Sequence, residues 1–178
     1  MIKFLKHLIL ILSLLGVQLA IIPAAGDYLT GMNVVLTVLV FICVAYKFSL
    51  GVVYAFIVGF VLDLYSALPF GAILVALLLT LYVIHQLSLH FLTNKSFYAL
   101  IGLTFIAIIV NSLISYLYLA GFYFFQTSDL IVSRILVSAP SELLHQLGYN
   151  LALTVILFAV FHFTSRRFNA VFIDTTKN

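Results

Sequence analysis

The chain has 178 residues, of which 65% are hydrophobic and 7% are charged, and its mean hydropathy is +1.30. Because soluble globular proteins carry about 25% charged residues, this composition excludes a soluble domain and indicates a polytopic membrane protein. The formal net charge of +3 comes from basic residues scattered in short loops, not gathered in a patch, which argues against nucleic-acid binding.

We expect an all-α bundle of six transmembrane helices in one domain, since the length leaves room for about six spans of roughly 20 residues. The predicted spans are 8–25, 32–46, 49–66, 71–91, 97–125 and 141–164, and a cytoplasmic tail follows over 165–178. The first apolar run, with Pro23 to Gly26 at its end, also has the form of a signal peptide with a small-residue cleavage site. Because more spans follow at once, a retained first helix is the favoured interpretation.

The turn Pro69-Phe70-Gly71 separates the third and fourth spans, since proline fixes one backbone dihedral and glycine tolerates strained ones. After the aromatic end of the fifth span, Ser128 and Asp129 are suited to cap a short amphipathic helix over 128–138 lying in the membrane interface. Pro140 then suits the first turn of the sixth span.

Loop charges predict the orientation of these spans. With the amino terminus in the cytoplasm, one basic residue, Arg134, falls outside, together with Asp27 and Asp129. The other basic residues fall inside: Lys3, Lys6, Lys47, Lys95, Arg166, Arg167 and Lys177. The positive-inside rule therefore predicts that both termini are cytoplasmic.

The third span carries small residues four apart, Gly51, Ala55 and Gly59, and the next position in that series is Asp63. Residues at this spacing form one stripe on a helix, which Ala67 would extend. Small residues in lipid let two backbones approach closely, so we expect the stripe to be a helix-packing or partner contact.

Asp63 requires a partner, because an acid within a membrane costs about 2.5–3.5 kcal/mol at mid-span. The nearest candidates are the backbone N–H groups that open the fourth span and the hydroxyl of Tyr65. Three roles stay open: joining the hairpin of the third and fourth spans, contacting another protein or ligand, and relaying protons.

No motif predicts catalysis, a cofactor or a metal. Glu142 and His145 have the Glu-x-x-His spacing of helical di-metal sites, but such sites need a second copy and further glutamates. His85 and His90 diverge on a helix, and Cys43 is expected to pack as a small hydrophobe. An intramembrane enzyme is the least favoured reading.

The stretch GFVLDLYSALPFGAILVALLLTLY (residues 59–82) resembles the central segment of the rod shape-determining protein MreD family. Gln18 and Pro23 near the end of the first helix, and an amphipathic segment leading into Pro140, extend the resemblance along the chain. In two places the chain departs from it: Met32-Asn33 replaces a Pro-Asp or Pro-Asn pair, and Ala67-Leu68 replaces a glycine. The family residues that match are Gly59, Asp63, Pro69 and Gly71.

The resemblance implies a non-enzymatic inner-membrane component of the bacterial cell-elongation complex. Its implied partner is an MreC-like bitopic protein, through which it connects with an MreB-like cytoskeleton, a RodA-like glycosyltransferase and a penicillin-binding transpeptidase. The alternative is a substrate-binding S-component of an energy-coupling-factor vitamin transporter, whose six-helix arrangement the family resembles. Its site would use polar and aromatic residues at the outer face: Asp63, Tyr65, Asn111, Tyr116, Tyr123 and Glu142.

Overall fold

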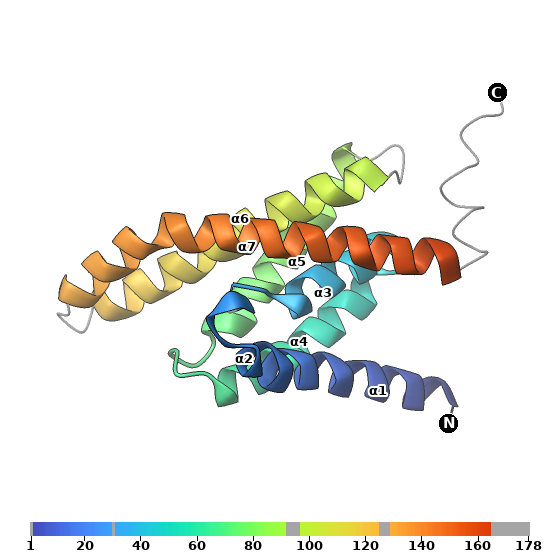
Figure 1. The fold of residues 1–178 in the computed structure, drawn as a ribbon, viewed down its shortest axis with the longest axis horizontal. Coiled ribbons are helices and arrows are strands. Elements are labelled where there is room, and N and C mark those ends of the chain that lie inside the picture. Colours follow the sequence, from blue (N-terminus) through green and yellow to red (C-terminus); the bar gives the residue numbers. More distant parts are fainter. Residues whose placement is uncertain (1, 30, 92–96, 125–128, 165–178) are drawn as a thin grey trace.

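A computed structural model of the chain describes residues 2–29, 31–91, 97–124 and 129–164. Throughout these residues the regular elements are helical and no strand occurs, as Figure 1 shows. The elements are α1 (Ile2–Gly16), the π-helical turn η1 (Val17–Ile21), α2 (Ile22–Ala24), the 3₁₀ turn η2 (Gly26–Leu29), α3 (Val34–Ala45), α4 (Phe48–Tyr65), α5 (Ala72–Phe91), α6 (Phe97–Phe124) and α7 (Asp129–Thr164). The predicted all-α membrane bundle is confirmed.

Five helical segments are long and apolar enough to cross a membrane: Leu5–Ala24, Phe48–Tyr65, Ala72–Leu89, Tyr98–Phe124 and Leu143–Val160. The first of them combines α1, η1 and α2. Its π turn lodges one extra residue in the helix, which rotates the side chains that follow. Gln18 lies within this turn.

α3 covers 12 of the 15 residues in the range 32–46 that we predicted as the second span. Its 12 residues extend about 18 Å, against about 30 Å for the hydrocarbon core. Eight of its residues are buried, and it packs against α1, α4, α5, α6 and α7. α3 is therefore the internal element around which the other helices assemble.

The predicted interfacial helix over 128–138 and the predicted span over 141–164 are one helix. α7 runs for 36 residues from Asp129 to Thr164, about 54 Å, and continues through Pro140. The predicted break at Pro140 is therefore wrong. Proline is tolerated inside membrane helices more often than inside soluble ones, and here α7 continues through it. Figure 1 shows α6 and α7 leaving the rest of the bundle side by side.

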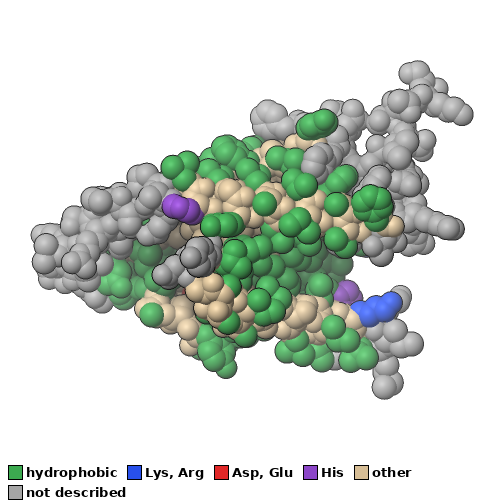
Figure 2. Space-filling view, viewed as in Figure 1, with side chains coloured by type: hydrophobic (Ala, Val, Ile, Leu, Met, Phe, Trp, Pro, Cys, Tyr) green, Lys and Arg blue, Asp and Glu red, His purple; other side chains and the backbone are tan. Residues whose placement is uncertain are grey.

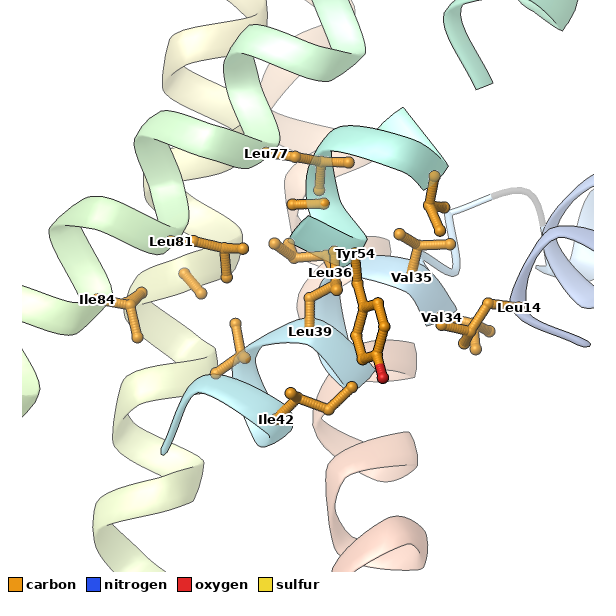
Figure 3. Packing of buried hydrophobic residues seen from close by; sticks show 14 of the residues in the cluster. Leu14, Val34, Val35, Leu36, Leu39, Ile42, Tyr54, Leu77, Leu81 and Ile84 are labelled. Atoms are coloured by element: carbon orange, nitrogen blue, oxygen red, sulfur yellow. The ribbon is translucent and has the colours of Figure 1, made fainter. Parts of the chain in front are cut away.

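The core forms around α3. In Figure 3, Leu36 and Leu39 of α3 lie beside Tyr54 of α4 and beside Leu77 and Leu81 of α5. Each of these five side chains is at most 5% exposed. Large apolar side chains also cover the outside, as expected where the solvent is lipid, and Figure 2 shows hydrophobic side chains over much of one face.

The bundle has two ends. The hairpin end is the one at which α4 ends and α5 begins, and the N-terminal end is the one at which α1 begins. α1 and α4 both run from the N-terminal end toward the hairpin end.

Candidate functional site

Asp63 joins the end of α4 to the start of α5. It is 3% exposed, and its two carboxylate oxygens accept hydrogen bonds from the N–H groups of Ile73 and Leu74, both at 2.9 Å. These donors belong to the first turn of α5, where an N–H has no partner in its own helix. The carboxylate also faces the positive end of the α5 dipole. Of the two partners considered from the sequence, the carboxylate thus contacts the backbone N–H groups, while the side chain of Tyr65 is 74% exposed.

The turn between α4 and α5 is stabilised by a hydrogen bond within the turn and by a second one from α6. The N–H of Ala72 donates to the carbonyl of Pro69 at 3.1 Å, and Gly71 adopts a φ of +93°, which favours glycine. The hydroxyl of Tyr118 on α6 donates to the carbonyl of Phe70 at 2.8 Å. The hairpin of α4 and α5 is therefore fixed to α6.

The small-residue stripe is buried inside the chain. A Cβ atom on Gly59 would lie 3.2 Å from the Cα of Leu74, and one on Gly51 would overlap the Sγ of Cys43 on α3. Ala55, between them, is fully buried. The stripe thus faces α3 at its start and α5 at its end, so its contacts here are intramolecular.

Ala67 does not extend this stripe, contrary to the expectation from spacing. α4 ends at Tyr65, and Ala67 is exposed in the turn beyond it. The helix stops because Ser66 adopts an extended conformation, with ψ at 151°.

A cavity of about 440 Å³ opens near the hairpin end, and we call it the hairpin-end cavity. Its wall includes apolar residues such as Leu62 and Leu77, and its polar side chains come from η1, the start of α3, the α4–α5 turn, α6 and α7. These polar residues are Gln18, Asn33, Tyr65, Ser66, Asn111, Ser112, Ser115, Tyr116 and Gln146.

Amide side chains hold the start of α3 against this cavity. The N–H of Asn33 donates to Asn150 Oδ1 at 2.8 Å, and the N–H of Val34 donates to Gln18 Oε1 at 3.0 Å. The side chain of Asn33 accepts from the N–H of Leu36 at 2.9 Å. Three backbone donors that a helix start leaves without partners are thus bound by amides from three elements. This explains how a short helix begins inside the bundle.

The same network reaches α6 and α7. Asn150 is fully buried, and its Nδ2 donates to the carbonyl of Gln146 at 2.9 Å. The hydroxyl of Ser112 on α6 donates to Gln146 Oε1, also at 2.9 Å. Next to it, Asn111 Oδ1 is buried and accepts no hydrogen bond from any residue that the structure describes. Asn111 is also a lining residue of the hairpin-end cavity, and a buried acceptor without a partner is costly.

The predicted outer-face residues divide into three groups. Tyr65, Asn111 and Tyr116 line the hairpin-end cavity. Asp63 and Tyr123 are not among its lining residues, because Asp63 is turned to the start of α5 and Tyr123 lies in the last turn of α6. The side chain of Glu142 lies outside the described part of the chain.

The sequence favoured no metal site, and among the described residues no three His, Cys, Asp or Glu side chains come together. The ring of His85 stacks on Phe48, with centroids 4.0 Å apart. The side chains of His90 and Glu142 fall outside the described set, so the pairs that include them are not described.

Sequence reasoning missed the amides Gln18, Asn33, Gln146 and Asn150 as one set. The signal was present: each is a neutral polar residue within or beside a predicted span, and such residues in membrane helices usually face the protein interior. Their mutual contacts join residues up to 117 positions apart, which helical periodicity does not reveal.

Comparison with known proteins identifies the family of the chain. Neither a curated protein nor a solved structure matches it. A family model described as rod shape-determining protein MreD matches residues 1–167, nearly the whole chain. The chain belongs to the MreD family, and it is a multi-pass membrane protein of the machinery that determines rod shape.

Proposed function

We propose that this protein is a non-enzymatic scaffold of the cell-elongation complex and binds an MreC-like bitopic membrane protein at its hairpin-end cavity. Through that partner it connects with the MreB-like cytoskeleton, the RodA-like glycosyltransferase and the penicillin-binding transpeptidase. Family membership supports the shape-determining role. The observation that supports the docking site is a cavity with a partly polar lining inside a largely apolar bundle; one of its lining residues, Asn111, has a buried acceptor without a described partner.

The loop charges support an orientation in the bacterial inner membrane with both termini in the cytoplasm. In that orientation the hairpin end is the periplasmic end, and the hairpin-end cavity opens where a bitopic protein leaves the bilayer. A chain segment at that boundary carries backbone N–H and C=O groups that need partners. The amide and hydroxyl groups that line the cavity include both donors and acceptors, and Asn111, whose Oδ1 has no described partner, is one of the lining residues.

The stripe from Gly51 to Asp63 supports this function indirectly. Its residues are buried against α3 and α5, so they shape the hairpin that forms one wall of the cavity. In this proposal the partner contacts the cavity and not the stripe. Asp63 is ill-suited to acid–base chemistry, since both of its oxygens accept backbone hydrogen bonds.

The test is co-purification of the MreC-like protein from the same genome with a variant whose cavity is filled. Ser115 lines the cavity, whereas Leu117, two residues further on α6, is 64% exposed. Ser115→Trp is expected to weaken partner binding by about thirtyfold or more and to lower partner recovery accordingly, because blocking a pocket at an interface costs about 2 kcal/mol or more. Leu117→Trp is the matched control and should leave recovery unchanged. Equal recovery with both variants, at equal membrane levels, contradicts the docking site.

The second candidate is a vitamin-binding S-component, which the size and mixed polar and aromatic lining of the hairpin-end cavity favour. Gentle detergent purification from the native host separates the two functions. A scaffold brings down an MreC-like protein. An S-component brings down a pair of ATPases with a transmembrane coupling protein.

A further inference from the structure

A second cavity, of about 370 Å³, lies toward the N-terminal end of the bundle, and we call it the α1–α7 groove. Residues of α1, α3 and α4 line it together with Leu157 of α7. Figure 2 shows a hollow between α1 and α7, floored by hydrophobic side chains, with a basic side chain and a histidine beside its mouth. None of its lining residues belongs to the hairpin-end cavity.

The chemistry of the groove changes along its length. Lys6 and His7 are exposed at one end, and the ring nitrogen Nδ1 of His7 hydrogen-bonds the hydroxyl of Tyr54. Deeper in, the wall is hydrocarbon, with residues such as Leu14 and Phe41. A ligand that fits must therefore have a polar head and an apolar tail.

The length of the groove identifies the kind of tail. Lys6 and Leu14 are eight residues apart on α1, about 12 Å along the helix axis. One leaflet of the hydrocarbon core is about 15 Å thick, so the groove runs from the membrane boundary nearly to the midplane. A partner helix would require a groove of about 30 Å, whereas one acyl chain of a lipid fits this length.

Charge identifies the head. Lys6 reaches the boundary with a flexible cationic side chain. The only acidic side chain that the structure describes, Asp63, lies nine residues beyond Tyr54 on α4, about 13 Å toward the opposite end. No described carboxylate stands beside Lys6, so its charge is available to a phosphate.

We propose that the α1–α7 groove binds an anionic phospholipid, with one acyl chain along the groove and the headgroup phosphate beside Lys6. The site holds a lipid of the leaflet at the N-terminal end and is independent of partner docking at the hairpin-end cavity.

The test adds lipid to the delipidated full-length protein in detergent and counts bound lipids by native mass spectrometry. Phosphatidylglycerol and phosphatidylcholine with identical acyl chains are the two probes. Wild type is expected to bind phosphatidylglycerol more tightly. Lys6→Gln should weaken phosphatidylglycerol about fivefold, as expected for the loss of one basic residue at a membrane surface, and weaken phosphatidylcholine less, because its choline already offsets the phosphate charge. Lys47→Gln, which removes an exposed lysine outside the groove, is the matched control and should bind as wild type does.

A second pair of variants tests the acyl-chain part of the site. Val38 lines the groove, whereas Val53 on α4 does not line it and is 52% exposed. Val38→Trp should reduce binding of both lipids, and Val53→Trp should not. Equal phosphatidylglycerol binding by Lys6→Gln and Lys47→Gln would overturn the proposal, as would unchanged lipid binding by folded Val38→Trp. Should Val38→Trp not fold, the lysine pair decides alone.

Discussion

Replacing Asp63 with asparagine and with leucine measures how strongly this side chain joins α4 to α5. Both variants remove the negative charge, and both therefore avoid the free-energy cost of placing a carboxylate in the membrane. This contribution cancels when the two variants are compared. Asparagine keeps one oxygen that can accept from Ile73 or Leu74, whereas leucine leaves both N–H groups without an acceptor. One such hydrogen bond is worth about 1–3 kcal/mol when its loss strands a buried donor.

Asp63→Leu should therefore be less stable than Asp63→Asn by about 1–3 kcal/mol, or roughly 2–12 °C in Tm for a chain of this length. Thermal unfolding in one detergent, followed by circular dichroism, measures this difference. Leu64→Ala is the control, since Leu64 is the next residue along α4 and is 60% exposed. If asparagine and leucine give the same Tm, or asparagine the lower one, the helix-joining role assigned to the carboxylate is refuted.

Three further predictions concern packing and the start of α3. Gly59→Leu should destabilise the protein by about 1–3 kcal/mol or more in the same unfolding assay, because Leu74 leaves no room for a side chain; Gly102→Leu, at a site with nothing within 4 Å, should not. Gly51→Ala should destabilise by overlap with Cys43, and adding Cys43→Ala should recover part of the loss, a coupling that a double-mutant cycle measures. Asn150→Leu should cost about 1–3 kcal/mol by stranding the N–H that begins α3, and equal stability to wild type would contradict this.

Helical geometry and side-chain size predicted the hairpin from local sequence. The four-residue spacing of Gly51, Ala55 and Gly59 predicted a close-packed face, and the structure buries all three. For Asp63 the sequence left two partners open, the N–H groups that open the next helix and the hydroxyl of Tyr65, and the structure pairs the carboxylate with the N–H groups. Each of these contacts joins residues at most about 15 apart, a range over which local patterns carry information.

Tertiary contacts determine the features that local sequence patterns did not predict correctly. The 12 residues of α3 look like a weak membrane span, but their role as an internal helix depends on Gln18 and Asn150, which lie far away in sequence. The break expected at Pro140 reflected the preference of proline for a first helical turn, and α7 instead continues through it beside α6. Ala67 fell outside the stripe because spacing alone does not say where a helix ends.

The hairpin-end cavity was predicted only in part for the same reason. Aromatic and polar residues near the outer face suggested Tyr65, Asn111 and Tyr116. The amides that bind the start of α3 were not grouped with them, because each is isolated within its own apolar run.

Photo-crosslinking in living cells tests most directly whether the hairpin-end cavity is the docking site. A benzophenone amino acid is placed at Tyr116, which lines the cavity, or at Leu117, the adjacent residue of α6, which is exposed and does not line it. On irradiation, the probe at position 116 should crosslink to the MreC-like protein and the probe at position 117 should not. A crosslink to that protein from position 117 alone, at equal expression, would contradict docking in the cavity.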